Sequence, residues 1–151
     1  MTDTSPGQPL TPCLTDGRFL RSVQHILLAA QEQVDALALR CLGGGGCCKF
    51  DLAGHRLYVS IGELALLTAD GPPRPNRDLP PLRCPYQCGP RCTARRSRPL
   101  GCRTHFCDPS HDDTLAAIYE AHHARIRRLH DRFAKPYAYV ELTAALASMS
   151  K

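Results

Sequence analysis

The chain of 151 residues lacks the features of membrane-spanning and secreted proteins. No run of about eighteen apolar residues occurs, so the sequence predicts no membrane-spanning helix. The first residues, MTDTSPGQPLTPC, contain no basic segment followed by an apolar stretch, so we expect no secretory signal. We therefore expect a cytoplasmic protein in which thiols stay reduced.

Acidic residues are absent from one long stretch of the chain. Between Arg83 and Arg103 there are six arginines and no aspartate or glutamate, in a chain whose net charge is +5. Such a run can bind phosphates or balance the negative charge of thiolates. Nucleic-acid binding would normally come with aromatic side chains for stacking, and residues 83–107 contain only Tyr86 and Phe106. The composition therefore disfavours nucleic acid as a partner and favours charge compensation.

The spacing common in zinc sites is missing too, although cysteine is abundant. The chain has nine cysteines, and an odd number in a reducing compartment argues against a disulfide framework. None of their spacings is the C-x2-C knuckle found in many zinc sites. Iron–sulfur clusters, in contrast, are bound by cysteine thiolates on irregular loops. We predict that the cysteines bind an iron–sulfur cluster, such as [4Fe–4S], or iron, with zinc as the alternative.

Apolar periodicity predicts two long helices. Apolar residues from Leu20 to Cys41 recur at steps of three and four, which predicts a helix over residues 17–42 with Asp16 as its N-cap. Cys41 is then either a core residue or a ligand. A capping box of Ser110 and Asp113 predicts a second helix that ends near Lys135. The remaining predictions are a disordered segment over residues 1–15, a strand at 56–60, and short helices at 63–69 and 137–148.

The predicted fold class is mainly α: a single small domain over residues 16–150, in which two long helices and a short strand carry irregular cysteine-rich loops. Loop 41–50 holds the run CLGGGGCCKF, whose four glycines give the backbone slack to turn around a small ion. Loop 84–108 holds five cysteines and three prolines without periodicity. Such a segment buries too little apolar surface to order itself, so we expect a metal to order it.

Eight cysteines are candidate metal ligands, and two arginines are candidate supporting residues that would compensate the charge of the thiolates or fix the loops through hydrogen bonds to carbonyl groups. Cys13 is expected to take no part, because it lies in the segment predicted to be disordered. His105, between two candidate cysteines, could bind the metal or tune it. His122 is expected to be a core histidine, and the arginines of residues 125–132 a solvated helix face. The candidate ligands are Cys41, Cys47, Cys48, Cys84, Cys88, Cys92, Cys102 and Cys107, and the supporting residues are Arg98 and Arg103.

The pattern resembles the YkgJ-type cysteine-cluster family, described as a zinc- or iron-chelating C-x2-C-x2-C-C domain. In the first motif Cys41, Cys47 and Cys48 fall in register, while Gly44 takes the second cysteine position. The segment LYVSIGEL matches the strand and helix that follow the first motif in the family. The second motif agrees at eight positions, with Arg95 in place of the family's tyrosine: Cys84, Pro85, Tyr86, Cys92, Arg98, Pro99, Cys102 and Arg103.

The resemblance covers about residues 41–107 and implies metal or cluster binding, with Cys88 or Cys107 replacing the ligand lost at Gly44. A related module occurs in flagellin lysine methylases, but no glycine-rich loop for a methyl donor is found here. Three functions stay open: a metal-binding module, a redox or modification enzyme that uses the centre, and a structural zinc domain that docks to another macromolecule. Candidate acids or bases for an enzyme are His105, Tyr86 and Glu63. Catalytic residues, substrate and protein partner stay unknown.

Overall fold

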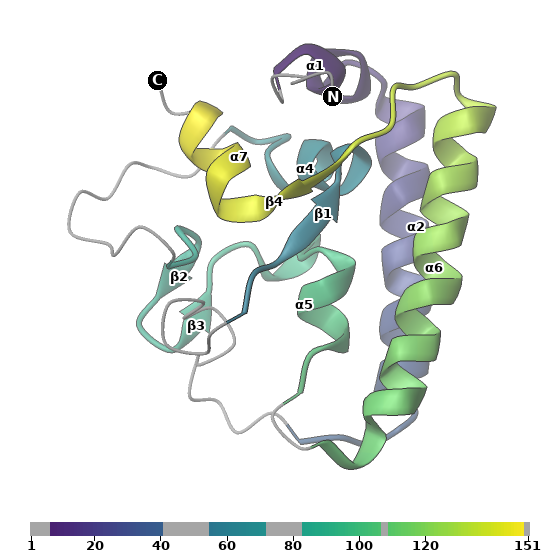
Figure 1. The fold of residues 1–151 in the computed structure, drawn as a ribbon, viewed down its shortest axis with the longest axis vertical. Helices are drawn as coiled ribbons and strands as arrows, with labels where there is room; N and C mark the ends of the chain where they lie inside the picture. Colours follow the sequence, from purple (N-terminus) through teal and green to yellow (C-terminus); the bar gives the residue numbers. More distant parts are fainter. Residues whose placement is uncertain (1–6, 41–54, 72–82, 107–108, 150–151) are drawn as a thin grey trace.

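The computed structural model describes residues 7–40, 55–71, 83–106 and 109–149. These residues form the predicted small, mainly helical domain around two long helices, α2 (Gly17–Asp35) and α6 (Asp112–Arg132). Helices α2 and α6 run antiparallel along one side of the molecule, and the shorter elements pack on the other side of this pair (Figure 1). The shorter helices are α1 (Gly7–Leu14), α4 (Ile61–Leu67), α5 (Leu100–Thr104) and α7 (Leu142–Met149), with 3-10 turns η2 (Arg95–Ser97) and η3 (Pro109–His111).

Two small antiparallel pairs of strands connect the helices. Strand β1 (Tyr58–Ser60) pairs with β4 (Tyr139–Glu141), with Val59 opposite Val140. The predicted strand at 56–60 is therefore present in shortened form, and its partner comes from a segment that was expected to be helical. Strands β2 (Gln87–Cys88) and β3 (Arg91–Cys92) form a hairpin whose turn contains Gly89 at φ +59°, a conformation that favours glycine.

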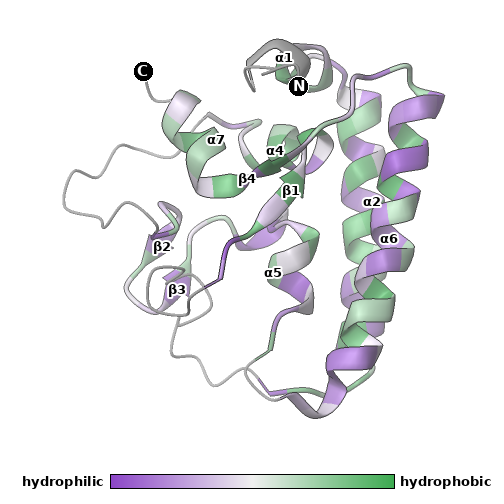
Figure 2. Ribbon diagram, viewed as in Figure 1, coloured by the Kyte–Doolittle hydropathy of each residue, from purple (hydrophilic) through white to green (hydrophobic). Residues whose placement is uncertain are grey.

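The core lies where α2, α4 and α6 meet. Figure 2 shows the hydrophobic sides of these helices turned toward each other and polar residues along the outer side of α6. Phe19, at the start of α2, contacts the His130 ring edge-to-face at a centroid distance of 5.0 Å. Gly62 fits between them, since a Cβ atom there would come within 2.8 Å of His130 Nε2. The largest fully buried side chains include Leu27, Ile61, Leu64, Leu100, Ile126, Leu142 and Leu146.

Helix α2 begins where the sequence predicts and ends earlier. The Asp16 carboxylate accepts hydrogen bonds from the backbone N–H groups of Arg18 and Phe19, so the predicted N-cap is confirmed. The helix ends at Asp35 instead of residue 42, and Ala38 adopts a left-handed backbone conformation at φ +53°. The argument that placed Cys41 on the apolar stripe of this helix is therefore wrong. Cys41 itself lies outside the described residues.

The expected disorder over residues 1–15 is wrong for residues 7–14, which form α1. This helix packs against α4, and its Leu10 and Cys13 are buried in the core. Burial raises the pKa of the Cys13 thiol to about 11. Cys13 is thus a small apolar core residue, which agrees with its exclusion from the candidate ligands.

Helix α6 covers most of the predicted range, but its N-terminus differs. The predicted capping box of Ser110 and Asp113 is wrong, because the N-cap residue is His111 and no side chain caps the helix. The preceding residues form the turn η3, which places the helix start at Asp112. His122 is 2 % exposed, and its Nδ1 lies 2.7 Å from the Ile118 carbonyl oxygen. The prediction of a satisfied core histidine is confirmed.

No helix within the described residues is long and apolar enough to span a bilayer.

Candidate metal centre

One buried carboxylate organises the elements that carry the second cysteine segment. Glu63, 3 % exposed, forms the capping box of α4 with Ser60, whose backbone N–H and hydroxyl both donate to Oε2 at 2.8 and 2.7 Å. The other carboxylate oxygen accepts the backbone N–H of Leu100, the first residue of α5, at 2.8 Å. Glu63 thus caps two helices, and it fixes α5 relative to α4.

Arg103 holds the loop before α5. Its Nε donates to the Arg98 carbonyl at 2.8 Å and its Nη2 to the Arg96 carbonyl at 3.0 Å. Its Nη1 and the Nη2 of Arg98 each donate to the Gln31 side-chain oxygen of α2 at 3.2 Å. Hydrogen bonding to carbonyl groups was one of the two roles considered for these arginines. Burial lowers the pKa of Arg103 to about 10, with Arg98 adding to the effect and Cys102 and Glu63 opposing it.

The four described candidate ligands lie just before the hairpin, in the hairpin and on α5. Cys84 precedes the hairpin and is 6 % exposed, whereas Cys88 in the hairpin is exposed. Cys92 ends β3 and is half-buried, and Cys102 is half-buried on α5. The backbone N–H of Gln87 donates to the Cys84 carbonyl, which starts the turn into the hairpin.

Tyr86 links the hairpin to α4. Its hydroxyl donates to the Leu67 carbonyl, and its own carbonyl accepts both the backbone N–H and the hydroxyl of Thr93. Burial raises the pKa of Tyr86 to about 12, and negative charge on Cys84 and Cys92 adds to the shift. Tyr86 acts as a support for the cysteine-bearing hairpin, since its hydroxyl is already occupied.

Two histidines meet where the two cysteine segments border the described residues. The rings of His55 and His105 lie 5.1 Å apart at an interplanar angle of 30°. His55 is the first described residue after the segment that contains Cys41, Cys47 and Cys48, and His105 follows Cys102 by three positions. Burial lowers the pKa of His105, and His55 lowers it further.

A shallow cavity of about 270 Å³ lies beside His105. Asp112, Tyr119 and Glu120 of α6 line its other side. Of the three acid or base candidates named from the sequence, His105 alone lines this cavity. The other two have structural hydrogen bonds: the carboxylate of Glu63 at two helix caps and the hydroxyl of Tyr86 at the Leu67 carbonyl.

Half of the candidate ligands fall outside the described residues: Cys41, Cys47, Cys48 and Cys107, and with them the whole predicted loop 41–50. Within the described ranges, no three or more histidine, cysteine, aspartate or glutamate side chains are grouped closely enough to hold a metal ion. Cys84, Cys88, Cys92 and Cys102 therefore do not form a metal site by themselves in the part of the chain that the structure describes. Their chemistry fits a thiophilic metal, because they are thiols with arginine nearby.

Two residues in this region, Gln31 and His55, were not predicted from the sequence. Gln31 receives both arginine side chains, but on the sequence it is only a polar residue of an amphipathic helix. His55 belongs to no recognised motif, and its contact with His105 spans 50 positions of sequence (105 − 55). Neither had a local pattern that could have revealed it.

Comparison with known proteins gives no match to this chain among protein-family models, curated proteins or solved structures. The resemblance to the YkgJ-type family stays a prediction from the motif residues.

Proposed function

We propose that the chain is a metal-binding cysteine-cluster protein that holds an iron–sulfur cluster or iron through cysteine thiolates, with zinc as the alternative. The contact between His55 and His105 carries this proposal. Cys48 precedes His55 by seven residues (55 − 48), a span of at most about 25 Å of chain. Cys102 and Cys107 flank His105. The contact supports one centre that draws thiolates from both cysteine segments.

The charges around the described thiols support the same function. Arg103 lies close enough to Cys102 for the charge of a thiolate there to raise the pKa of the guanidinium, against the larger effect of burial. By reciprocity, a fixed positive charge favours the thiolate, which is the form of cysteine that binds metals. The acid-free arginine run would then balance the negative charge of a thiolate-bound centre.

The packing of the second cysteine segment also supports metal binding. Among residues 83–106 only four side chains are buried: Cys84, Pro99, Leu100 and Arg103. A segment that buries so little apolar surface gains order from other bonds, and a metal bound by several of its cysteines would supply them. The hydrogen bonds of Glu63 and Arg103 provide a base on which such a site can form.

A bound cluster would supply one-electron chemistry, and a zinc ion a structural link. The ligands would come from Cys84, Cys88, Cys92 and Cys102 together with cysteines of the other segment. The enzyme alternative is favoured by one observation, the cavity at His105 with two carboxylates and a phenol on its far wall. A metal-binding module needs no such cavity and is the simpler proposal.

Metal analysis of anaerobically purified protein tests the proposal. We expect a brown chain with iron and acid-labile sulfide in stoichiometric amounts; colourless protein with stoichiometric zinc would select the zinc alternative. Reduced protein that contains neither metal, and takes up neither on addition, would refute metal binding altogether.

Two cysteine variants assign the metal to the proposed ligands. Cys102→Ser should lose most of the metal, whereas Cys13→Ala should keep it, because Cys13 is a buried core residue of α1. Both variants should retain the helical circular dichroism of α2 and α6, since these helices pack through apolar residues. Full metal content in Cys102→Ser would remove it from the ligand set.

A further inference from the structure

A groove of about 480 Å³ lies between the first half of α2 and the second half of α6, away from the described cysteine-bearing residues 83–106. Arg125, Arg128 and Arg132 of α6 line one side, and Ser22 and His25 of α2 line the other. Because α2 and α6 are antiparallel, the N-terminal end of one helix lies beside the C-terminal end of the other. The basic residues of both helices thus gather at the same end of the pair.

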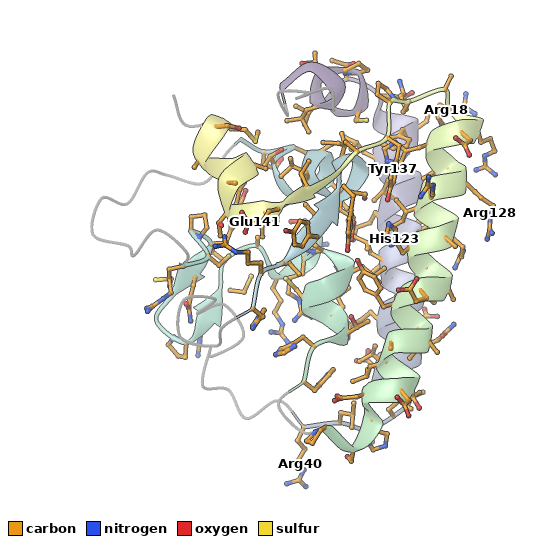
Figure 3. The ribbon with its side chains drawn as sticks, viewed as in Figure 1. Arg18, Arg40, His123, Arg128, Tyr137 and Glu141 are labelled. Carbon is orange, nitrogen blue, oxygen red and sulfur yellow. The ribbon has the colours of Figure 1, made fainter. Side chains whose placement is uncertain are left out.

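The positive charge of this groove is not balanced locally. None of Arg125, Arg128 and Arg132 forms an ion pair with a described residue; Lys135 and Asp16 do pair, at 3.0 Å. Arg18 and Arg21 extend the basic surface along α2, and Figure 3 places Arg18 and Arg128 near the same end of the helix pair. Residues 17–31 contain no acid, and residues 121–132 contain one, against four arginines. The groove therefore presents an uncompensated positive surface.

The spacing of the arginines suits a chain of anions. Residues three and four apart on a helix are neighbours, with Cβ atoms about 5–6 Å apart, so Arg125, Arg128 and Arg132 form one row along α6. Guanidinium groups bind phosphate oxygens with paired hydrogen bonds. We propose that this groove binds the phosphodiester backbone of a nucleic acid, independently of the metal centre.

The lining of the groove favours nucleic acid over an acidic protein segment. Its two apolar residues, Ile26 and Leu129, are 6 % and 5 % exposed, so they offer no accessible anchor. Protein interfaces depend on such anchors, whereas nucleic-acid interfaces are more polar and more positive. The described lining residues include no phenylalanine, tyrosine or tryptophan, so we expect backbone contacts without sequence preference. The scarcity of aromatic residues that disfavours nucleic-acid binding applies to residues 83–107, and the described residues that line this groove lie outside that range.

Fluorescence anisotropy of the full chain with labelled double-stranded and single-stranded DNA tests this proposal. Arg128→Gln should weaken binding roughly tenfold at low salt and reduce the slope of log K against log salt by about 1. Arg127→Gln is the matched control, because it removes the same charge one position away. The guanidinium of Arg127 lies over the Tyr137 ring at 4.9 Å, on the other flank of α6, so binding should stay unchanged.

Three outcomes would overturn the proposal. Equal weakening by both variants would mean that net charge alone attracts DNA. Tighter binding of a polyglutamate peptide than of either oligonucleotide would assign the groove to an acidic protein. Absence of salt-dependent binding to both oligonucleotides would mean that the arginines are only a solvated helix face. Preference for one of the two DNA forms would support the proposal and identify which form the groove takes.

Discussion

Replacing Glu63 by glutamine should destabilise the whole domain, although the two side chains have nearly the same shape. The carboxylate accepts three hydrogen bonds, from the backbone N–H and hydroxyl of Ser60 and from the backbone N–H of Leu100. An amide has one acceptor oxygen, so its NH2 group must face a donor on one side. If the oxygen stays with Ser60, the N–H of Leu100 loses its partner at the start of α5.

The cost follows from these three bonds. A buried donor left without a partner costs about 1–3 kcal/mol, and each bond that changes from a charged to a neutral acceptor loses about 1 kcal/mol. The guanidinium of Arg103 also loses a nearby negative charge. The sum is about 3–5 kcal/mol, a large share of the 5–15 kcal/mol of a typical domain.

Urea denaturation followed by circular dichroism measures this loss. With a slope of about 2 kcal/mol per molar, the midpoint of Glu63→Gln should fall by about 2 M. Glu32→Gln, at an exposed position of α2, is the control and should change stability by less than about 0.5 kcal/mol. A Glu63→Gln midpoint equal to that of the wild type would refute the role of this carboxylate as a cap for both helices.

Three further predictions concern the core and the thiols. Gly62→Ala should lower stability by about 1–2 kcal/mol in the same assay, because its Cβ would press on His130 and Phe19; an unchanged midpoint would contradict this packing. Burial lowers the pKa of His130. Its contribution to stability is therefore complete above about pH 6.5 and decreases as the pH falls below that value. His130→Phe should make the urea midpoint less dependent on pH below about 6.5. In native, metal-free protein, a thiol reagent should modify the exposed Cys88 quickly and the buried Cys13 only after unfolding. Mass spectrometry of the two peptides measures the order of modification, and modification of Cys13 before Cys88 would contradict the prediction.

Features with a local sequence pattern could be predicted. Asp16 precedes an apolar stripe, and the N-cap that this pattern indicates is present. Glu63 is the first residue of the short helix that the sequence predicts at 63–69, a position that favours a carboxylate. It forms a capping box with Ser60 at the start of α4, but the N–H of Leu100 that its other oxygen accepts comes from 37 positions away (100 − 63).

Features set by tertiary contacts could not be predicted from the sequence. Helix α2 ends at Asp35 although the apolar stripe continues, because the chain turns at Ala38 without a glycine to mark it. Strand β4 is only three residues long and forms because β1, about eighty positions earlier, offers an edge. The segment YAYVELTAALAS has the composition of a helix, and only its second part is one, α7.

The hydrogen bonds around α5 distinguish two forms of the proposed metal site, a binding module and a structural zinc domain. A structural zinc domain typically unfolds without its metal, because the metal supplies its folding energy. Here the segment that carries Cys84 to Cys102 is attached to α4 through Glu63 and to α2 through Arg103. Cys84 is buried, but none of the four described candidate ligands belongs to the main apolar cluster. Removal of the metal should therefore loosen residues 83–106 and leave α2 and α6 protected. Hydrogen exchange of metal-free and metal-bound protein would reveal this difference, and loss of protection throughout α2 and α6 on metal removal would favour the structural zinc domain over the binding module.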